Sequence, residues 1–190
     1  ILIGKKAGLK TIKFQIFTLD ERSTPQSKEE KIFKNLTLNE QEWKKSVKFA
    51  HKKGLFVFAD IFGTKSFEIA KNSRVDGFKI HSEDTLNYPL IKKVLRLNKI
   101  TIISTGGAYR SELFSLINYL ERKNLANNLI LMAGYQVFPT PFASHSLKEI
   151  LDLTKKYKKF DLKIGFSDHV KGGIEESFFL PISAISSGAE

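Results

Sequence analysis

Short apolar runs alternate with amphipathic stretches along most of the 190-residue chain, and this alternation restricts the fold more than any other feature. The apolar runs lack in/out alternation, which is typical of strands covered on both faces. The clearest helical stretch follows Asn39, places Trp43 and Ala50 on one face and ends at Gly54. The predicted strands are 9–17, 55–62, 77–84, 99–107, 128–136 and 162–169. The predicted helices are 38–54, 64–73 with Thr64 as its cap, 88–98, 110–124, 146–159 and 174–188.

Strands that alternate with helices predict an α/β fold with a parallel sheet. Two forms of that fold stay open, a doubly wound open sheet and a (β/α)₈ TIM barrel. No GxGxxG motif opens the first helix, which disfavours a dinucleotide-binding sheet. A barrel has eight strands and about 250 residues, so this chain would be two strands short. We expect residues 1–190 to form a single domain, because no linker divides them.

The composition excludes several classes of protein. The chain has no cysteine, so it has neither disulfides nor thiolate metal sites. No apolar run reaches the roughly 18 residues of a membrane span, and the first residues carry no signal-peptide pattern. We therefore expect a cytoplasmic protein without a membrane partner. The net charge of +11 comes from lysines spread over helical positions, which indicates solvated helix faces rather than a nucleic-acid surface.

Polar side chains stand near the carboxyl end of almost every predicted strand. In a barrel these ends converge on one face, where catalytic residues come from several strands, so we expect one convergent site. The candidate residues are Lys13, Gln15, Asp60, Lys79, His81, Ser82, Asp84, Ser104, Thr105, Gln136, Ser167, Asp168 and His169. His51 and His145 are expected on the surface instead, on a helix and a loop.

Lys13 and Lys79 are the most informative of these residues, because each lies within an apolar run. An unpaired ammonium group in such a place costs several kcal/mol, so each lysine needs an anion. Two alternatives stay open: a neighbouring carboxylate, or a bound substrate that carries phosphate and carboxylate groups. Nearby hydroxyls and the glycine-rich "STGG" turn suit the second alternative.

Five motifs together resemble the sialic acid synthase family. They are "KFQ" (13–15), "FKIHSEDTLNYPLIKKV" (78–94), "IISTGG" (102–107), "FPTP" (138–141) and "GFSDH" (165–169). The resemblance implies a partial (β/α)₈ barrel with about six of eight βα units. It also implies a transferase that condenses phosphoenolpyruvate with an N-acetylhexosamine, for cell-surface polysaccharide biosynthesis. The products are a sialic-acid-like nonulosonic acid and phosphate, and the cofactor is a divalent metal, Mn²⁺ or Mg²⁺.

The resemblance also implies roles for individual residues. Lys13 and Lys79 would hold the phosphate and carboxylate of phosphoenolpyruvate, and Gln15 would reach the sugar. Hydroxyl contacts would come from Ser82, Ser104 and Ser167. His169 would be one of two metal ligands, with the second outside this chain. Asp84 would be the acid/base group.

Parts of the family pattern lie outside this chain. These are the first strand, the eighth strand with its metal-binding histidine, and the C-terminal antifreeze-like domain. We therefore expect a chain cut at both ends, poorly stable or inactive by itself, and a homodimer when full length.

Several positions depart from the family pattern. Asp60 stands where the family has threonine, and Asp84 is one methylene shorter than the family's glutamate. A shift of about 1 Å in a catalytic group can cost on the order of 100-fold in rate. Gln136 and Phe138 replace the usual asparagine or serine and tyrosine. These changes indicate an altered sugar pocket or lost activity.

Two alternatives to the synthase follow from the departures. The first is a barrel aldolase or lyase that does not use phosphoenolpyruvate, in which an internal lysine forms a Schiff base. Asp60 favours it, because a negative charge disfavours an anionic substrate. The second is a non-catalytic relative that binds a sugar or a phosphate.

Overall fold

The structure is a computed structural model that describes residues 1–160 and 162–190. The chain forms two compact units, Ile1–Asp84 and Thr85–Glu190. In both units a strand is repeatedly followed by a helix, and the strands within each unit are parallel neighbours in chain order. Both units therefore have the α/β organisation that the sequence predicts.

The first unit is built on three parallel strands. They are β1 (Thr11–Ile16), β2 (Phe56–Ile61) and β3 (Gly77–Ile80). Its helices are α1 (Leu2–Lys6), α2 (Leu19–Arg22), α3 (Glu30–Leu36), α4 (Glu40–Lys52) and α5 (Thr64–Asn72). A single 3₁₀ turn, Ser82–Asp84, follows β3. The prediction extended the third strand to residue 84, but this strand ends at Ile80.

Helix α4 confirms the predicted cap and buried face. The Asn39 side chain accepts a hydrogen bond from the Glu42 backbone N–H at 3.0 Å, and the Glu42 carboxylate accepts one from the Asn39 N–H at 2.7 Å. This reciprocal pair is a capping box, which satisfies two backbone donors at the start of the helix. Trp43, Val47 and Ala50 are buried as one face.

The start of helix α5 corrects one prediction. Thr64 is the first residue of the helix, and the cap position before it is Gly63. The cap comes from elsewhere in the chain: the two carboxylate oxygens of Glu21 accept hydrogen bonds from Lys65 N–H at 2.6 Å and Ser66 N–H at 2.8 Å. A carboxylate also suits the positive end of the helix dipole, so Glu21 takes the role predicted for Thr64.

Helices α2 and α3 were not predicted. Both are short, and tertiary contacts hold them in place. The Phe33 ring of α3 packs edge-on against Phe17, with 5.7 Å between centroids. The Arg22 guanidinium of α2 lies 4.5 Å from the centroid of the same Phe33 ring.

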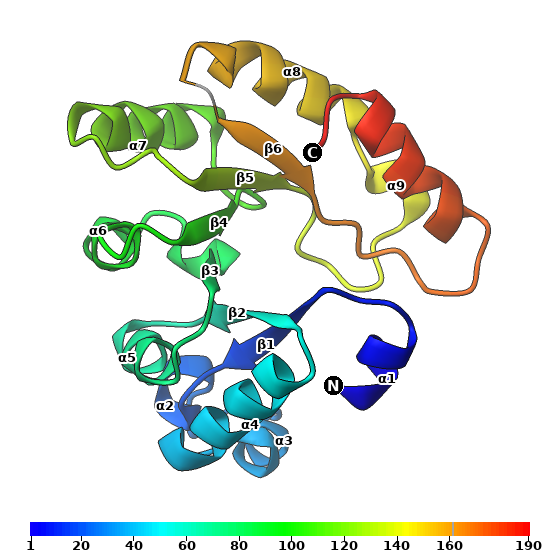
Figure 1. Ribbon diagram of the computed structural model, residues 1–190. Helices are drawn as coiled ribbons and strands as arrows, with labels where there is room; N and C mark the ends of the chain where they lie inside the picture. Colours follow the sequence, from blue (N-terminus) through cyan, green and yellow to red (C-terminus); the bar gives the residue numbers. More distant parts are fainter. Residues whose placement is uncertain (161) are drawn as a thin grey trace. The chain divides into compact units, whose positions relative to one another are not determined.

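The second unit repeats the same organisation. Its strands are β4 (Ile100–Ser104), β5 (Leu129–Ala133) and β6 (Lys163–Phe166). Its helices are α6 (Tyr88–Leu95), α7 (Arg110–Arg122), α8 (Leu147–Tyr157) and α9 (Glu176–Ser186). Figure 1 shows β4, β5 and β6 side by side, with α7 and α8 along them. Each strand is shorter than predicted, because the polar residues at its carboxyl end belong to the following loop.

The core of the second unit lies between its strands and helices. Leu116, Ile117 and Leu120 of α7 are fully buried, and so is Leu131 of β5. No helix of the described residues is long and apolar enough to cross a membrane.

Candidate active site

Strand pairing brings three of the predicted site residues into one row. Gln15 of β1 is in register with Asp60 of β2, and Asp60 is in register with Lys79 of β3. Residues in register on neighbouring parallel strands point to the same face of the sheet. Lys13 precedes Gln15 by two residues, so it lies on that face as well, diagonal to Asp60.

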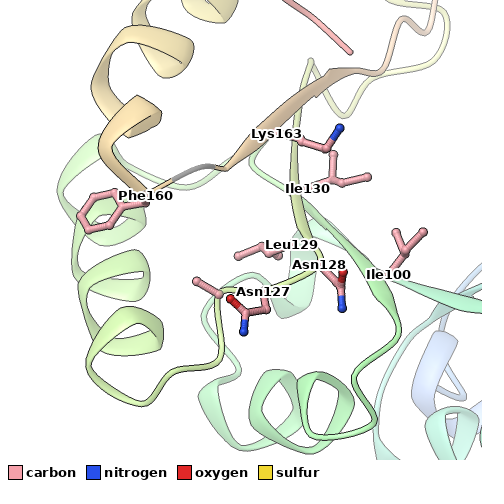
Figure 2. A pocket seen from close by; sticks show the side chains of 8 residues that line it. Ile100, Asn127, Asn128, Leu129, Ile130, Phe160 and Lys163 are labelled. Carbon is pink, nitrogen blue, oxygen red and sulfur yellow. The ribbon is translucent and has the colours of Figure 1, made fainter.

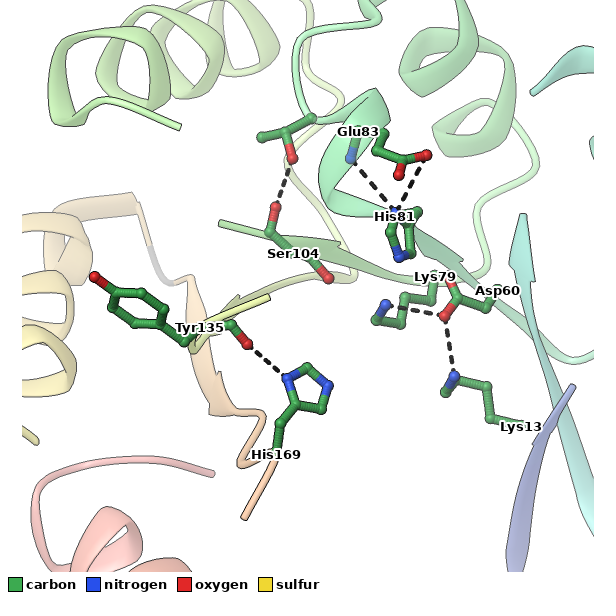
Figure 3. A network of polar contacts seen from close by, with 9 residues as sticks. Lys13, Asp60, Lys79, His81, Glu83, Ser104, Tyr135 and His169 are labelled. Atoms are coloured by element: carbon green, nitrogen blue, oxygen red, sulfur yellow. Dashed lines mark hydrogen bonds and ion pairs between the residues drawn. The ribbon is translucent and has the colours of Figure 1, made fainter. Parts of the chain in front are cut away.

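Asp60 links the two lysines. One carboxylate oxygen, Oδ2, accepts a hydrogen bond from Lys13 Nζ and another from Lys79 Nζ, both at 3.0 Å (Figure 3). The exposed fraction of the side chain is 1% for Asp60, 11% for Lys79 and 41% for Lys13. Of the two alternatives that the sequence left open, the structure shows the carboxylate partner. Lys13 is the more accessible of the two ammonium groups.

The surroundings of Lys79 bear on its charge. Burial lowers the pKa of the Lys79 ammonium, the Asp60 carboxylate raises it in part, and the Lys13 charge lowers it further. The other Asp60 oxygen, Oδ1, is buried and has no hydrogen-bond partner among the described residues. The two lysines are therefore the hydrogen-bond donors that the described residues offer this carboxylate.

His81 lies beside this cluster and contributes no positive charge to it at neutral pH. Its ring packs on Phe62 with 4.8 Å between centroids. Burial lowers the pKa of His81, and the nearby Asp60 carboxylate offsets the effect only in part.

Gly77 of β3 makes room for the side chain of Phe58, which lies on β2 next to the Lys13–Asp60–Lys79 cluster. Phe58 of β2 is in register with Gly77 of β3. A Cβ atom at Gly77 would lie 2.3 Å from the Phe58 ring, which is far inside van der Waals contact. Gly77 therefore lets the Phe58 ring lie across β3. This pair stands two residues before the pair formed by Asp60 and Lys79.

Ser82 and Asp84 lie just beyond β3 in the 3₁₀ turn. Both are half-buried, and the Asp84 backbone N–H donates to the His81 carbonyl at 3.0 Å. They stand two and four residues after the end of β3, which keeps them at its carboxyl end.

In the second unit, Ser104 ends β4 and is fully buried. Its hydroxyl has no hydrogen-bond partner among the described residues, whereas its carbonyl accepts from the Thr85 hydroxyl at 2.7 Å. A buried hydroxyl without a partner is costly unless a ligand or water completes it.

Two glycines set how closely the loops after β4, β5 and β6 approach. A Cβ at Gly106 would lie 2.4 Å from the Gly134 carbonyl oxygen, and one at Gly134 would lie 2.2 Å from the Ser167 carbonyl oxygen. Gly134 also has a φ of +144°, which side chains rarely allow. Sequence reasoning named Gly106 but missed Gly134. Its only signal is that it directly follows an apolar strand.

A backbone contact orients the ring of His169. Its Nδ1 atom donates to the Tyr135 carbonyl oxygen at 2.6 Å (Figure 3), which leaves Nε2 as the ring nitrogen available to a ligand. The His169 carbonyl accepts from Thr140 N–H at 2.8 Å, so the loops after β5 and β6 hold each other. No group of three or more histidine or acidic side chains that could hold a metal occurs in the described part of the chain.

The remaining predicted residues differ in exposure. Gln136 and Phe138 are exposed in the loop after β5, and the Phe138 ring packs edge-on against the His169 ring with 6.4 Å between centroids. Ser167 is half-buried, and its N–H donates to the Ala133 carbonyl at 2.8 Å. Gln136, Phe138, Ser167 and His169 thus belong to the neighbouring loops after β5 and β6.

His51 and His145 were both predicted on the surface. The prediction is confirmed for His51, which is exposed and lies 2.8 Å from Asp76. It is wrong for His145, because both ring nitrogens are buried without a hydrogen-bond partner among the described residues. The reason is packing, since its ring lies 5.8 Å from the Phe166 ring of β6. Burial lowers the pKa of His145.

A cavity of about 500 Å³ lies at the opposite end of the second unit's strands (Figure 2). It is lined by residues at the amino ends of β4, β5 and β6, among them Ile100, Asn128 and Lys163. In parallel barrels the catalytic residues stand at the carboxyl ends, so this cavity is separate from the predicted site.

Comparisons with known proteins identify the family of this chain. A model of the NeuB family matches residues 1–190. The uncharacterized protein MJ1065 of Methanocaldococcus jannaschii is 30% identical over 98% of this chain and 53% of its own length. A pseudaminic acid synthase of Campylobacter jejuni is 28% identical over 100% of this chain and 57% of its own length. The chain thus spans about half the length of these curated relatives.

Solved structures show the same fold. The N-acetylneuraminic acid synthetase of Leptospira borgpetersenii matches with a TM-score of 0.85 at 28% identity, over 98% of this chain and 62% of that one. A DAHP synthase of Thermotoga maritima matches with a TM-score of 0.71 at 20% identity, over 99% of this chain and 52% of that one. The predicted α/β class and the partial (β/α)₈ barrel are confirmed.

Proposed function

Because the chain belongs to the NeuB family, we propose that its protein condenses phosphoenolpyruvate with an N-acetylated hexosamine. The products would be a sialic-acid-like nonulosonic acid and phosphate. The Lys13–Asp60–Lys79 cluster carries this proposal. Each ammonium group gives one of its three N–H donors to Asp60 Oδ2, which leaves further donors for an anionic substrate. The synthase relatives support the class of product, since their names include pseudaminic acid and N,N'-diacetyllegionaminic acid synthases.

The proposed roles of the side chains follow their chemistry. Lys13 and Lys79 bind the anionic groups of phosphoenolpyruvate, and Ser82, Ser104 and Ser167 donate hydroxyl hydrogen bonds. The buried Ser104 hydroxyl supports such a role, because it has no partner among the described residues. Gln15, Gln136 and Phe138 contact the sugar.

Proton transfer falls to Asp84, which is half-buried beyond the end of β3. A carboxylate at the carboxyl end of a parallel strand is a suitable position for a general acid or base. As aspartate it reaches less far than glutamate would, so we expect a lower turnover rate than from the longer residue.

His169 fits a divalent metal, Mn²⁺ or Mg²⁺, because its Nδ1 is held by the Tyr135 carbonyl and its Nε2 faces no partner in the described hydrogen bonds. When bound, such a metal supplies Lewis-acid polarisation of the sugar carbonyl. A second ligand would come from outside this chain, and we propose that the whole protein acts as a homodimer.

The test of this proposal is phosphate release from phosphoenolpyruvate by the full-length protein. Mn²⁺ and a panel of N-acetylated and diacetamido hexoses would be supplied, with and without EDTA. We expect release that depends on one sugar of the panel and stops with EDTA. A folded protein that releases no phosphate with any sugar would contradict the proposal.

A second candidate function is a barrel aldolase or lyase that acts on a 2-oxo acid. The lowered pKa of Lys79 favours it, because a neutral amine can attack a carbonyl and form an imine with loss of water. Borohydride reduction in the presence of pyruvate would then attach the three-carbon acid to Lys79. An unmodified lysine under those conditions excludes this candidate.

A further inference from the structure

Asp60 occupies the position between the two lysines that a bound anion would share. Both Nζ atoms donate to its Oδ2 at 3.0 Å, so they can be no more than about 6 Å apart. Two positive charges and one negative charge leave the cluster with a single net positive charge, and His81 adds none at neutral pH.

We propose that Asp60 is a specificity-determining residue that acts as an internal counter-anion. In its presence the lysine pair accepts a singly charged carboxylate and discriminates against a doubly charged phosphate group. The inference rests on the proposed function in one respect, that the pair binds an anionic group of the substrate. It deepens that function by naming which group the pair prefers.

The burial of Asp60 keeps it in place. Its side chain is 1% exposed, and its Oδ1 has no hydrogen-bond partner among the described residues. Loss of both lysines would leave a buried charge without compensation, which is strongly unfavourable. An incoming anion therefore shares the lysines with Asp60 instead of replacing it.

Exposure indicates how the sharing occurs. The Lys13 side chain is 41% exposed and the Lys79 side chain only 11% exposed. Each ammonium group has three N–H donors, and Asp60 uses one of each. The remaining donors can bind an anion that approaches from the Lys13 side while Lys79 stays on Asp60.

Repulsion from Asp60 supplies the discrimination. An anion that contacts both lysines lies within about 6 Å of Oδ2. At an effective dielectric constant of about 20, two unit charges at that separation repel by the equivalent of about 100-fold in affinity. Solvent around Lys13 screens this effect, so we expect about tenfold for a monoanion and about 100-fold for a dianion.

The test compares two probes by isothermal titration calorimetry on the full-length protein and on its Asp60→Asn variant. Sulfate is the dianion and pyruvate the monoanion. A pH of 6 is chosen because burial lowers the pKa of Lys79, and a lower pH favours its ammonium form. We expect the dissociation constant of sulfate to fall about 100-fold in the variant and that of pyruvate about tenfold.

Three further variants make the outcome decisive. Asp76→Asn is the matched control, because Asp76 binds His51 and the Val57 N–H instead of the lysines, and it should leave both constants unchanged. Asp60→Ser replaces Asp60→Asn if that variant does not fold. Lys13→Gln keeps Asp60 and should abolish binding of both probes. An unchanged sulfate-to-pyruvate ratio in a folded Asp60 variant overturns the inference, as does normal binding by Lys13→Gln.

The failure of this inference is distinct from the failure of the proposed function. Sulfate and pyruvate binding require no turnover, whereas phosphate release from phosphoenolpyruvate does. A changed sulfate-to-pyruvate ratio without phosphate release would support the role of Asp60 and contradict the proposed synthase activity. Phosphate release with an unchanged ratio would support the synthase activity and contradict the role of Asp60.

Discussion

Lys79 has an unusual environment for a lysine, because its ammonium group is largely removed from solvent. It is nearly buried, it shares Asp60 with a second ammonium group, and burial lowers its pKa. Such perturbed groups occur more often at functional sites than elsewhere. The lysine stays in place because the Asp60 carboxylate compensates its charge at 3.0 Å.

Lys79→Met should weaken phosphoenolpyruvate binding by about 100-fold or more, because a charge contact in a partly buried site is lost. It should also lower the free energy of unfolding by about 2–3 kcal/mol, since Asp60 keeps only Lys13. Calorimetry and urea denaturation measure the two effects.

The matched control is Lys71→Met, which removes an exposed ion pair with Glu68 and should change stability by at most about 0.5 kcal/mol. The double variant Lys79→Met/Asp60→Asn should recover stability but not affinity. A Lys79→Met variant that binds phosphoenolpyruvate as the unmodified protein does would count against the assigned role.

His81 gives a pH-dependent prediction. Burial holds its pKa below the ordinary value of 6.5, so the unfolded chain takes up the proton first as the pH falls through 6.5. Folding stability therefore decreases with decreasing pH below that value. His81→Gln should make the loss of stability between about pH 7 and pH 5 smaller, as measured by urea denaturation at each pH. An identical pH dependence in the two proteins would show that His81 is not the group responsible.

At the scale of elements, the contact between β2 and β3 beside the site depends on the absence of a side chain at Gly77. Gly77→Ala would place a Cβ 2.3 Å from the Phe58 ring, so the ring or the strand must move. We expect a loss of about 1–3 kcal/mol in the free energy of unfolding, as for other overpacked positions. Thermal and urea denaturation measure the loss.

Gly172→Ala is the control for that substitution, because no atom lies within 4 Å of its added Cβ. It should leave stability within about 0.5 kcal/mol of the unmodified chain. Equal stability of the two variants would mean that the Phe58 ring moves away freely.

Most elements could be predicted because their signals are local. The Asn39 cap and the buried face of α4 are examples, and both are observed. The Glu21 cap of α5 could not be predicted, because the two partners are more than forty residues apart in sequence. The same holds for His145, whose burial depends on the Phe166 ring.

In the candidate site, too, the features set by local sequence could be predicted and those set by contacts between distant residues could not. That polar residues gather at the carboxyl ends of strands could be predicted from the alternation of strands and helices. Which anion would pair with the lysines could not, because strand register decides it. Asp60 lies between Gln15 and Lys79 only through the pairing of β2 with both neighbours.

For the whole molecule, the family and the fold class are established, whereas the reaction is proposed. The chain covers 53% and 57% of the length of the two relatives compared above. The second metal ligand is proposed to come from outside this chain. The central claim is therefore that the whole protein joins the carbon chain of phosphoenolpyruvate to a sugar.

The most direct measurement of that claim is mass spectrometry of the product formed from phosphoenolpyruvate labelled with ¹³C at all three carbons. The full-length protein, Mn²⁺ and the hexose panel would be incubated with either labelled phosphoenolpyruvate or labelled pyruvate. We predict a sugar acid that carries all three labelled carbons with phosphoenolpyruvate and none with pyruvate. Labelled sugar acid from pyruvate, or labelled pyruvate beside an unchanged sugar, would contradict the account.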